Sequence, residues 1–249
     1  MGFSHNIYMI RGANISADGM ENQKQMQEIL ADNLANTSTT GYKSYNIIHK
    51  LKALENSEDL TSSEAYGTSF DFSQGALRQT ENPLDLAING EGFFAVIDAQ
   101  GEIAYTRNGH FNIDNKGFLV TQHGDQVLDG SYAPIFIGID NVRTIDFLRN
   151  GNLIVNGDYT TTLKAYVFEK DQGILKLAQG KYKPSNAGEI LNSDIDSTIM
   201  QGFLEQSNVN SIEASTDMIQ IQRDYEANQK ALKVQMDSIE MLFRISDLQ

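Results

Sequence analysis

The chain has 249 residues, a formal net charge of −14 and a sequence pI of about 4.6. A nucleic-acid binder needs a basic surface to displace counterions from phosphates, and an acidic chain is repelled by an anionic membrane surface, so the charge argues against both partners. Cysteine is absent, which excludes disulfides, thiolate metal sites and cysteine nucleophiles. No apolar run is long enough to span a bilayer, and the N-terminus lacks the features of a cleavable signal peptide.

The first predicted element is a helix over residues 16–34. Its apolar positions recur at helical spacing and form one narrow stripe, so the helix must pack on a partner to be stable. The stripe ends in the segment Asn33–Tyr42, whose small polar residues suit tight turns. Residues 44–80 are then expected to form a linker or extended segment. Within it, residues 47–54 fit a strand or a short helix, and residues 55–64 an acidic exposed loop.

Residues 81–204 are predicted to form a β-rich domain. From residue 84 to about 191 the apolar period is two, and Asn-Gly pairs follow strand-like runs at Asn89, Asn108 and Asn156. These pairs tolerate positive φ at both central turn positions, so they favour hairpins. Expected strands cover residues 84–88, 93–97, 102–107, 110–113, 118–122, 134–139, 152–155 and 161–168.

Residues 205–249 are predicted to be dominated by one long helix. Asn210 is a plausible N-cap with Glu213 three residues later, and neither Gly nor Pro follows through Leu248. Two heptad rows form a seam with polar residues inside it. The first row is Met218, Tyr225, Leu232 and Ile239, and the second is Ile221, Asn228, Gln235 and Leu242.

A helix of about 38 residues would be about 55 Å long, too long for a β-domain of this size to cover. Its partner is therefore expected to be the N-terminal helix, which belongs with the assembly motif to the first predicted domain, residues 1–43. The predicted fold class is α+β, with the N- and C-terminal helices paired as a coiled-coil layer and a mainly antiparallel β-domain inserted between them.

Nothing in the sequence predicts catalysis, a cofactor or a metal site. The Gly-rich segment Asn89–Gly92 lacks the Lys-Ser/Thr of a phosphate-binding loop and precedes a strand. The calcium-loop-like residues 112–117 have His123 where a bidentate Glu is needed. The four histidines lack zinc-ligand spacing, and His110 with His123 is better explained as a solvent-facing cross-strand pair.

Three blocks resemble the bacterial flagellar basal-body rod and hook protein family. They are Asn33–Lys43 with Met9–Gly12 upstream, Asn82–Phe94 continuing to Tyr105–Gly109, and Gly202–Asn210 with Met218, Ile219 and Arg223–Glu226 after it. By this resemblance, residues 1–8 form an extension before the family's usual opening. The resemblance implies terminal helices in the inner layer of a tubular filament, a β-domain facing outward, and exit through the flagellar type III export apparatus.

The function that this resemblance implies is a structural subunit, not an enzyme, of the periplasm-spanning basal-body rod, the drive shaft that transmits torque. Its partners would be further copies of itself, related rod and hook subunits and the export apparatus. The proximal rod is favoured because the stretch between Tyr42 and Ser73 is short and because residues 213–219 resemble the proximal subunit. The alternatives are a distal rod subunit and, in another class, a β-domain binding module oligomerised by its C-terminal helix.

The residues expected to mediate assembly lie in the two signature segments. For the first segment the alternative is a helix end followed by side-chain turns, and for the second it is an intramolecular core; in both segments the two roles can hold together. The predicted set is Asn33, Leu34, Ala35, Asn36, Thr40, Gly41 and Tyr42 in the first segment, and Met218, Ile221, Tyr225, Leu232, Ile239 and Leu242 in the second.

Overall fold

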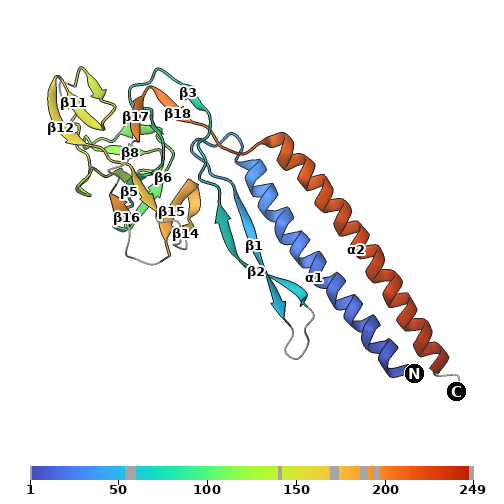
Figure 1. Cartoon of the computed structure of the whole chain (residues 1–249). Helices are drawn as coiled ribbons and strands as arrows, with labels where there is room; N and C mark the ends of the chain where they lie inside the picture. Colours follow the sequence, from blue (N-terminus) through green and yellow to red (C-terminus); the bar gives the residue numbers. More distant parts are fainter. Residues whose placement is uncertain are drawn as a thin grey trace. The chain divides into compact units, whose positions relative to one another are not determined.

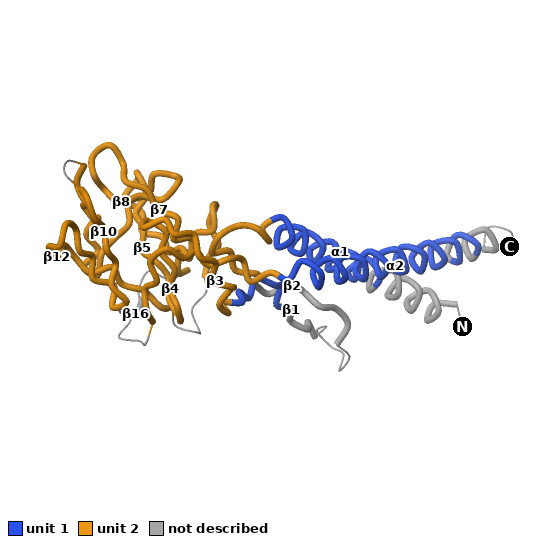
Figure 2. Tube along the Cα trace, turned by 90° about the horizontal axis from the view of Figure 1, so that it is seen from above, with its two compact units in different colours: residues 1–35, 45–71, 210–249 blue, residues 36–44, 72–209 orange. Residues whose placement is uncertain are grey.

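The computed structural model describes residues 2–53, 60–139, 142–168, 174–185, 190–192 and 197–246, with side chains from residue 16 onward except at 49–53, 60–67, 190–192, 239 and 242–246. The chain divides into two compact units (Figure 2). Unit 1 contains residues 1–35, 45–71 and 210–249, and unit 2 contains residues 36–44 and 72–209. The chain therefore passes from unit 1 to unit 2 and back twice.

Two antiparallel helices lie side by side in unit 1, α1 (Gly2–Ala35) and α2 (Ser211–Ser246) (Figure 1). The Asn228 Nδ2 donates a hydrogen bond to Gln23 Oε1 at 3.2 Å between them. At the N-terminus of α2, the Asn210 Oδ1 accepts from the backbone N–H of Ile212 and Glu213, at 3.1 and 3.4 Å. The predicted N-cap is confirmed.

Helix α1 begins well before the predicted start at residue 16. No proline interrupts residues 2–15, so the backbone can continue the helix. The two terminal helices and the antiparallel strands between them confirm the α+β class. The knobs-into-holes packing of a coiled coil stays a prediction.

A hairpin of β1 (Tyr45–Ala53) and β2 (Leu60–Phe70) completes unit 1. Residues 47–53 are therefore a strand, the first of the two alternatives, while residues 60–64, expected in a loop, also form a strand. The Asn33 side chain ties the hairpin to α1, because its Nδ2 donates to Tyr45 O at 2.9 Å and its Oδ1 accepts from Tyr45 N at 3.3 Å. The segment expected as a loop between them, residues 54–59, lies outside the described residues.

Unit 2 is built from short strands around one apolar core. The strands are β3 (Leu77–Gln79), β4 (Leu86–Asn89), β5 (Phe94–Ile97), β6 (Ile103–Thr106), β7 (Phe111–Ile113), β8 (Leu119–Thr121), β9 (Gln126–Val127), β10 (Ile145–Phe147), β11 (Asn152–Val155), β12 (Asp158–Thr162), β13 (Tyr166–Phe168), β14 (Ile174–Lys176), β15 (Lys181–Pro184), β16 (Ile190–Asn192), β17 (Thr198–Gln201) and β18 (Phe203–Glu205). All described pairs between these strands are antiparallel.

The largest sheet has the order β14-β15-β6-β5-β9-β8-β7, and a separate sheet has the order β10-β11-β12. Strands β4 and β3 pair with β17 and β18, so the start of the β-domain is joined to its end. Alternating residues of β4, β5 and β8 enter the core, among them Leu86, Phe94 and Leu119, which are fully buried. This alternation is the period of two that predicted the domain.

Two predicted strands differ from the structure. Residues 134–139 form only isolated bridges, Leu128 with Pro134 and Phe118 with Phe136, and not a strand. Pro134 has no backbone N–H for a ladder, and Gly138 has a φ of +93°, so the backbone departs from extended geometry. The predicted strand 161–168 is divided between β12 and β13.

The helices of unit 1 bury few side chains. In their described parts the buried residues are Ile29, Asn33 and Ala214, whereas the strands of unit 2 bury many large apolar residues. Local opening of a helix pair with so small a core costs little free energy.

In the isolated chain we therefore expect the amides of residues 215–245 to exchange with deuterium orders of magnitude faster than those of β5 and β6. Hydrogen exchange followed by mass spectrometry measures both segments in one sample, so the strands are the internal control. Full protection of residues 215–245 in the monomer would contradict this expectation.

Candidate functional site

A cluster of three buried charges in unit 2 joins three segments that are far apart in the sequence. The carboxylate of Glu205 lies between Lys43 and Arg107, with 2.6 Å from Lys43 Nζ to Oε1 and 3.0 Å from Arg107 Nη1 to Oε2. The exposed fractions of the three side chains are 0% for Lys43, 2% for Arg107 and 1% for Glu205. Such pairs are screened little by solvent and depend on each other. We call this set the buried ion cluster.

Backbone groups complete the hydrogen bonding of the cluster. Lys43 Nζ also donates to the carbonyl of Ser73, and Arg107 Nη2 donates to the carbonyl of Gly90 at 2.8 Å. The N–H of Gly75 donates to Glu205 Oε1 at 2.9 Å. Burial of Arg107 lowers the pKa of its guanidinium, and the nearby carboxylate of Glu205 opposes that shift. The cluster therefore fixes residues 73–75 and 90 as well as its own three members.

Gly41 brings the end of the first signature segment onto the same site. Its N–H donates to the carbonyl of Glu205 at 2.8 Å, and its φ is +68°, in the left-handed region. A Cβ at this position would lie 2.4 Å from the backbone carbon of Arg107. Only glycine satisfies both the backbone conformation and the close approach.

Tyr42 is buried and held by contacts within the subunit. Its hydroxyl accepts a hydrogen bond from Lys176 Nζ at 3.0 Å, and the same ammonium lies 4.7 Å from the ring centroid. The Tyr42 carbonyl accepts from the N–H of Asn208, and the Asn208 Oδ1 accepts from the N–H of Ser44 at 2.8 Å. The first signature segment is thus joined to the third within one chain.

The predicted assembly residues have different environments. Asn33 and Tyr42 are buried, Leu34, Asn36 and Thr40 are half-buried, and Ala35 is exposed at the end of α1. In α2, Met218, Ile221 and Leu232 are half-buried, at heptad spacings from Asn228, which contacts α1. Tyr225 is 36% exposed, and the side chains of Ile239 and Leu242 lie outside the described residues. The part that these residues play between subunits stays a prediction.

The three charged residues of the cluster were missed as site residues. Each lies inside one of the blocks that carry the family resemblance, Lys43 in the first, Arg107 in the second and Glu205 in the third. The available signal was a basic residue in each of the first two blocks and an acidic residue in the third. It could not specify a pairing across 162 residues of sequence.

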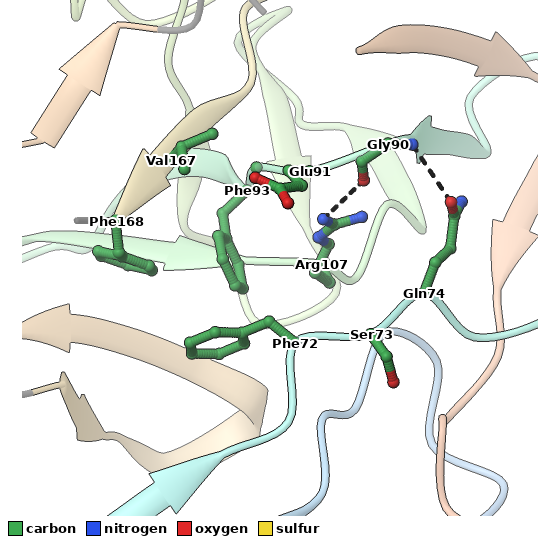
Figure 3. Close-up of a pocket in the computed structure, with 10 residues that line it drawn as sticks. Phe72, Ser73, Gln74, Gly90, Glu91, Phe93, Arg107, Val167 and Phe168 are labelled. Atoms are coloured by element: carbon green, nitrogen blue, oxygen red, sulfur yellow. Dashed lines mark hydrogen bonds between the residues drawn. The ribbon is translucent and has the colours of Figure 1, made fainter. Parts of the chain in front are cut away.

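A pocket of about 430 Å³ borders the cluster (Figure 3). Phe72, Phe93 and Phe168 form its aromatic wall, with ring centroids 5.2 Å apart for Phe72 and Phe93 and 4.9 Å for Phe93 and Phe168. The guanidinium of Arg107 lies 5.3 Å from the Phe93 centroid, and Glu91 also lines the pocket. We call this the aromatic pocket. The remaining lining residues are Ser73, Gln74, Gly90, Gly92 and Val167.

No metal-binding cluster is present in the part of the chain that the structure describes. No three His, Asp or Glu side chains there are placed to hold a metal ion. His110 Nδ1 lies 2.6 Å from Asp85 Oδ1, and His123 is exposed beyond the end of β8, which pairs with β7, so the cross-strand pair of His110 and His123 stays a prediction. Over the same described residues, no helix is long and apolar enough to cross a membrane.

Three family models match successive parts of the chain. The model for "Flagella basal body rod protein" matches residues 14–43, and that for "Flagellar hook protein FlgE/F/G D1 domain" matches residues 87–155. The model for "Flagellar basal body rod FlgEFG protein C-terminal" matches residues 200–244. The buried ion cluster takes Lys43 from the first matched part and Glu205 from the third.

Curated proteins match over most of their length. The flagellar basal-body rod protein FlgG of Buchnera aphidicola subsp. Acyrthosiphon pisum is 32% identical, over 96% of this chain and 100% of the relative. The flagellar basal-body rod protein FlgF of Caulobacter vibrioides is 33% identical, over 82% of this chain and 85% of the relative. FlgG of Bacillus subtilis is 28% identical, over 95% and 99%.

The terminal helices, the inserted β-domain and the joined signature segments define a structural protein of the flagellar basal body. The chain belongs to the flagellar basal-body rod protein family, and it is a structural subunit of the flagellar rod. This family is a structural component of the flagellum and not a family of enzymes. The relatives include both FlgG and FlgF, so the comparisons do not separate the two subunit types.

The buried ion cluster gives a direct test of its energetic role. Glu205→Leu leaves Lys43 and Arg107 buried without a counter-charge, and we expect a loss of about 3–5 kcal/mol in the free energy of unfolding of unit 2. Urea unfolding of the full chain followed by circular dichroism measures this loss. The control is Glu102→Leu at the solvent-exposed pair with Lys183, 2.8 Å apart, where about 1 kcal/mol or less is expected. Equal losses in the two variants would contradict the assignment.

Gly41→Ala tests the close approach at the signature segment. We expect a larger loss of unfolding free energy than for Gly101→Ala, where φ is also positive (+84°) but no atom lies within 4 Å of the new Cβ. Gly101→Ala already includes the backbone strain of about 1–2 kcal/mol for a left-handed alanine. The difference in lost unfolding free energy between the two variants therefore reports the collision of the new Cβ at residue 41 with the backbone of Arg107. The same urea titration measures both variants, and indistinguishable losses would show that the segment moves aside without cost.

Proposed function

We propose that this subunit polymerises through its terminal helices into the drive shaft that transmits torque for motility. The supporting observation is a set of exposed apolar side chains on one face of α2, interrupted on that face by charged residues such as Arg223 and Lys230, which we call the outer stripe. Its members and their exposed fractions are Ile212 (79%), Ile219 (55%), Val234 (65%) and Met241 (66%). Large apolar side chains that recur on one face of a helix suit packing against another helix.

The spacing of the outer stripe fits helix-on-helix packing. Steps of 7, 15 and 7 residues at about 100° per residue keep the four side chains within about 60° of one another around the helix. The outer stripe lies on a different face of α2 from the seam. The seam contains Asn228, whose side chain contacts Gln23 of α1. Helix α2 thus has one apolar face toward α1 and a second face available to a helix of another subunit.

The partners follow from this arrangement. The outer stripe and the seam of one copy would contact helices of further copies of this chain and of related rod and hook subunits. We place the subunit in the proximal rod, with the distal rod as the alternative, because the segment between the first signature and Ser73 is a short hairpin, β1–β2. Export through the flagellar type III apparatus and a place in the periplasm-spanning rod belong to the same proposal.

A complementation experiment tests the proposal. A strain that lacks the gene should yield basal bodies without a complete rod and hook, and the wild-type gene should restore them. Ile219→Asp combined with Val234→Asp should reduce the subunit recovered in basal bodies about tenfold or more, because charged side chains would be buried without partners in the helix contact.

The matched control is Gln222→Asp, an exposed polar position of the same helix. Electron microscopy of isolated basal bodies and immunoblotting measure the outcome. A complete rod and hook in the strain without the gene would reject the proposed function. Normal incorporation of the double variant would reject the outer stripe as the contact.

A further inference from the structure

We propose that the aromatic pocket receives Tyr159 of a second copy of this chain in the assembled rod. The inference rests on the proposed function, since it requires neighbouring copies. It assigns a receiving site and a projecting residue to unit 2, whereas the proposed contact between helices involves unit 1.

The size and lining of the pocket fit an aromatic side chain. A volume of about 430 Å³ lies within the range of about 300–1,000 Å³ that is usual for binding sites. Phe72, Phe93 and Phe168 offer ring faces and edges, and added aromatic rings pack well in offset or edge-on geometries. The wall is therefore suited to a flat ring and not to a small polar group.

The charged groups of the pocket suit a hydroxyl that both accepts and donates. Arg107 and Glu91 both line it (Figure 3), so the pocket contains a hydrogen-bond donor and a hydrogen-bond acceptor. The buried Nε of Arg107 has no hydrogen-bond partner in the described structure. A phenol can accept a hydrogen bond from a guanidinium and donate one to a carboxylate. Tyrosine combines this neutral hydroxyl with an aromatic ring.

The chain offers one projecting tyrosine on unit 2 among the residues with described side chains. Tyr42, Tyr105, Tyr166 and Tyr182 are buried, and the Tyr132 ring packs on Tyr166 with centroids 4.9 Å apart. Tyr159 has an exposed fraction of 64% and follows the tight turn at Asn156–Gly157, where φ is +54° and +93°. Its hydroxyl lies 3.0 Å from Thr162 Oγ1 of its own strand.

The contact would be heterologous, because the projecting residue and the pocket are different surfaces of the same chain. The hairpin β11–β12 that presents Tyr159 lies at the edge of unit 2 (Figure 1), whereas the pocket is formed by residues before β3 and around β5, β6 and β13. Heterologous contacts that do not close into a ring generate helical polymers, the symmetry that a rod requires. The proposed contact is therefore compatible with repeated addition of subunits.

Site-directed cross-linking tests the contact because the chain has no cysteine. Two differently tagged copies are expressed together in cells without the native gene, one with Val167→Cys in the pocket and the other with Asp158→Cys beside an intact Tyr159. Isolated basal bodies are treated with a short bis-maleimide, and an adduct that contains both tags is expected. Adding Tyr159→Ser to the second copy should lower the adduct about tenfold or more, as for loss of an aromatic anchor, whereas Tyr159→Phe should retain most of it.

The control pair replaces Val167→Cys by Gln100→Cys, at an exposed turn between β5 and β6. Immunoblotting for each tag first confirms that both copies are present in the basal bodies. An adduct no more abundant than that of the control pair, or one that does not depend on Tyr159, would overturn the inference and leave the proposed function intact. Absence of the wild-type chain from basal bodies would overturn both.

Discussion

One buried carboxylate joins the first signature segment, the β-domain and the end of β18 within unit 2. Glu205, at the end of β18, contacts Lys43 from the first signature segment and Arg107 from the β-domain, and all three side chains are almost completely buried. Removing Glu205 would leave two cations without a counter-charge in a low-dielectric interior, which costs several kcal/mol. The contacts to Ser73, Gly75 and Gly90 extend this dependence to the adjacent loops. Segments that enter and leave unit 2 are therefore held at one place.

The buried ion cluster separates two roles, stabilisation of the subunit and assembly with other subunits. On sequence alone, both roles are expected in the same signature segments. Gly41, Tyr42 and Lys43 are used within the subunit, where backbone approach, burial and ion pairing account for their identities. The outer stripe of α2 presents apolar side chains with no comparable intramolecular use. Under the proposed assembly through the outer stripe, the contacts that stabilise the monomer and those between subunits lie largely on different residues, and each can be changed without directly removing the other.

Local features of the fold could be predicted from the sequence because they have local causes. The Asn210 cap follows from one side chain and two nearby N–H groups, and the Asn-Gly turn at Asn156 follows from backbone freedom. Residues 134–139 resembled a strand by apolar pattern, but the ladder needs a hydrogen-bonding partner along the whole segment. The ion cluster required pairing of charges 162 residues apart, and charge identity alone does not specify such a pairing.

The buried ion cluster restricts the geometry at this position more narrowly than apolar contacts would. Apolar surfaces tolerate small sliding movements, whereas the Lys43–Glu205–Arg107 geometry stabilises one arrangement and penalises others by leaving charges unpaired. The helices of unit 1 bury few side chains in their described parts, so they contribute little to fixing the geometry of the subunit. The geometry of unit 2 then rests on directional polar contacts beside its apolar core, whereas the helices keep exposed apolar side chains, which the proposed contact between subunits would bury.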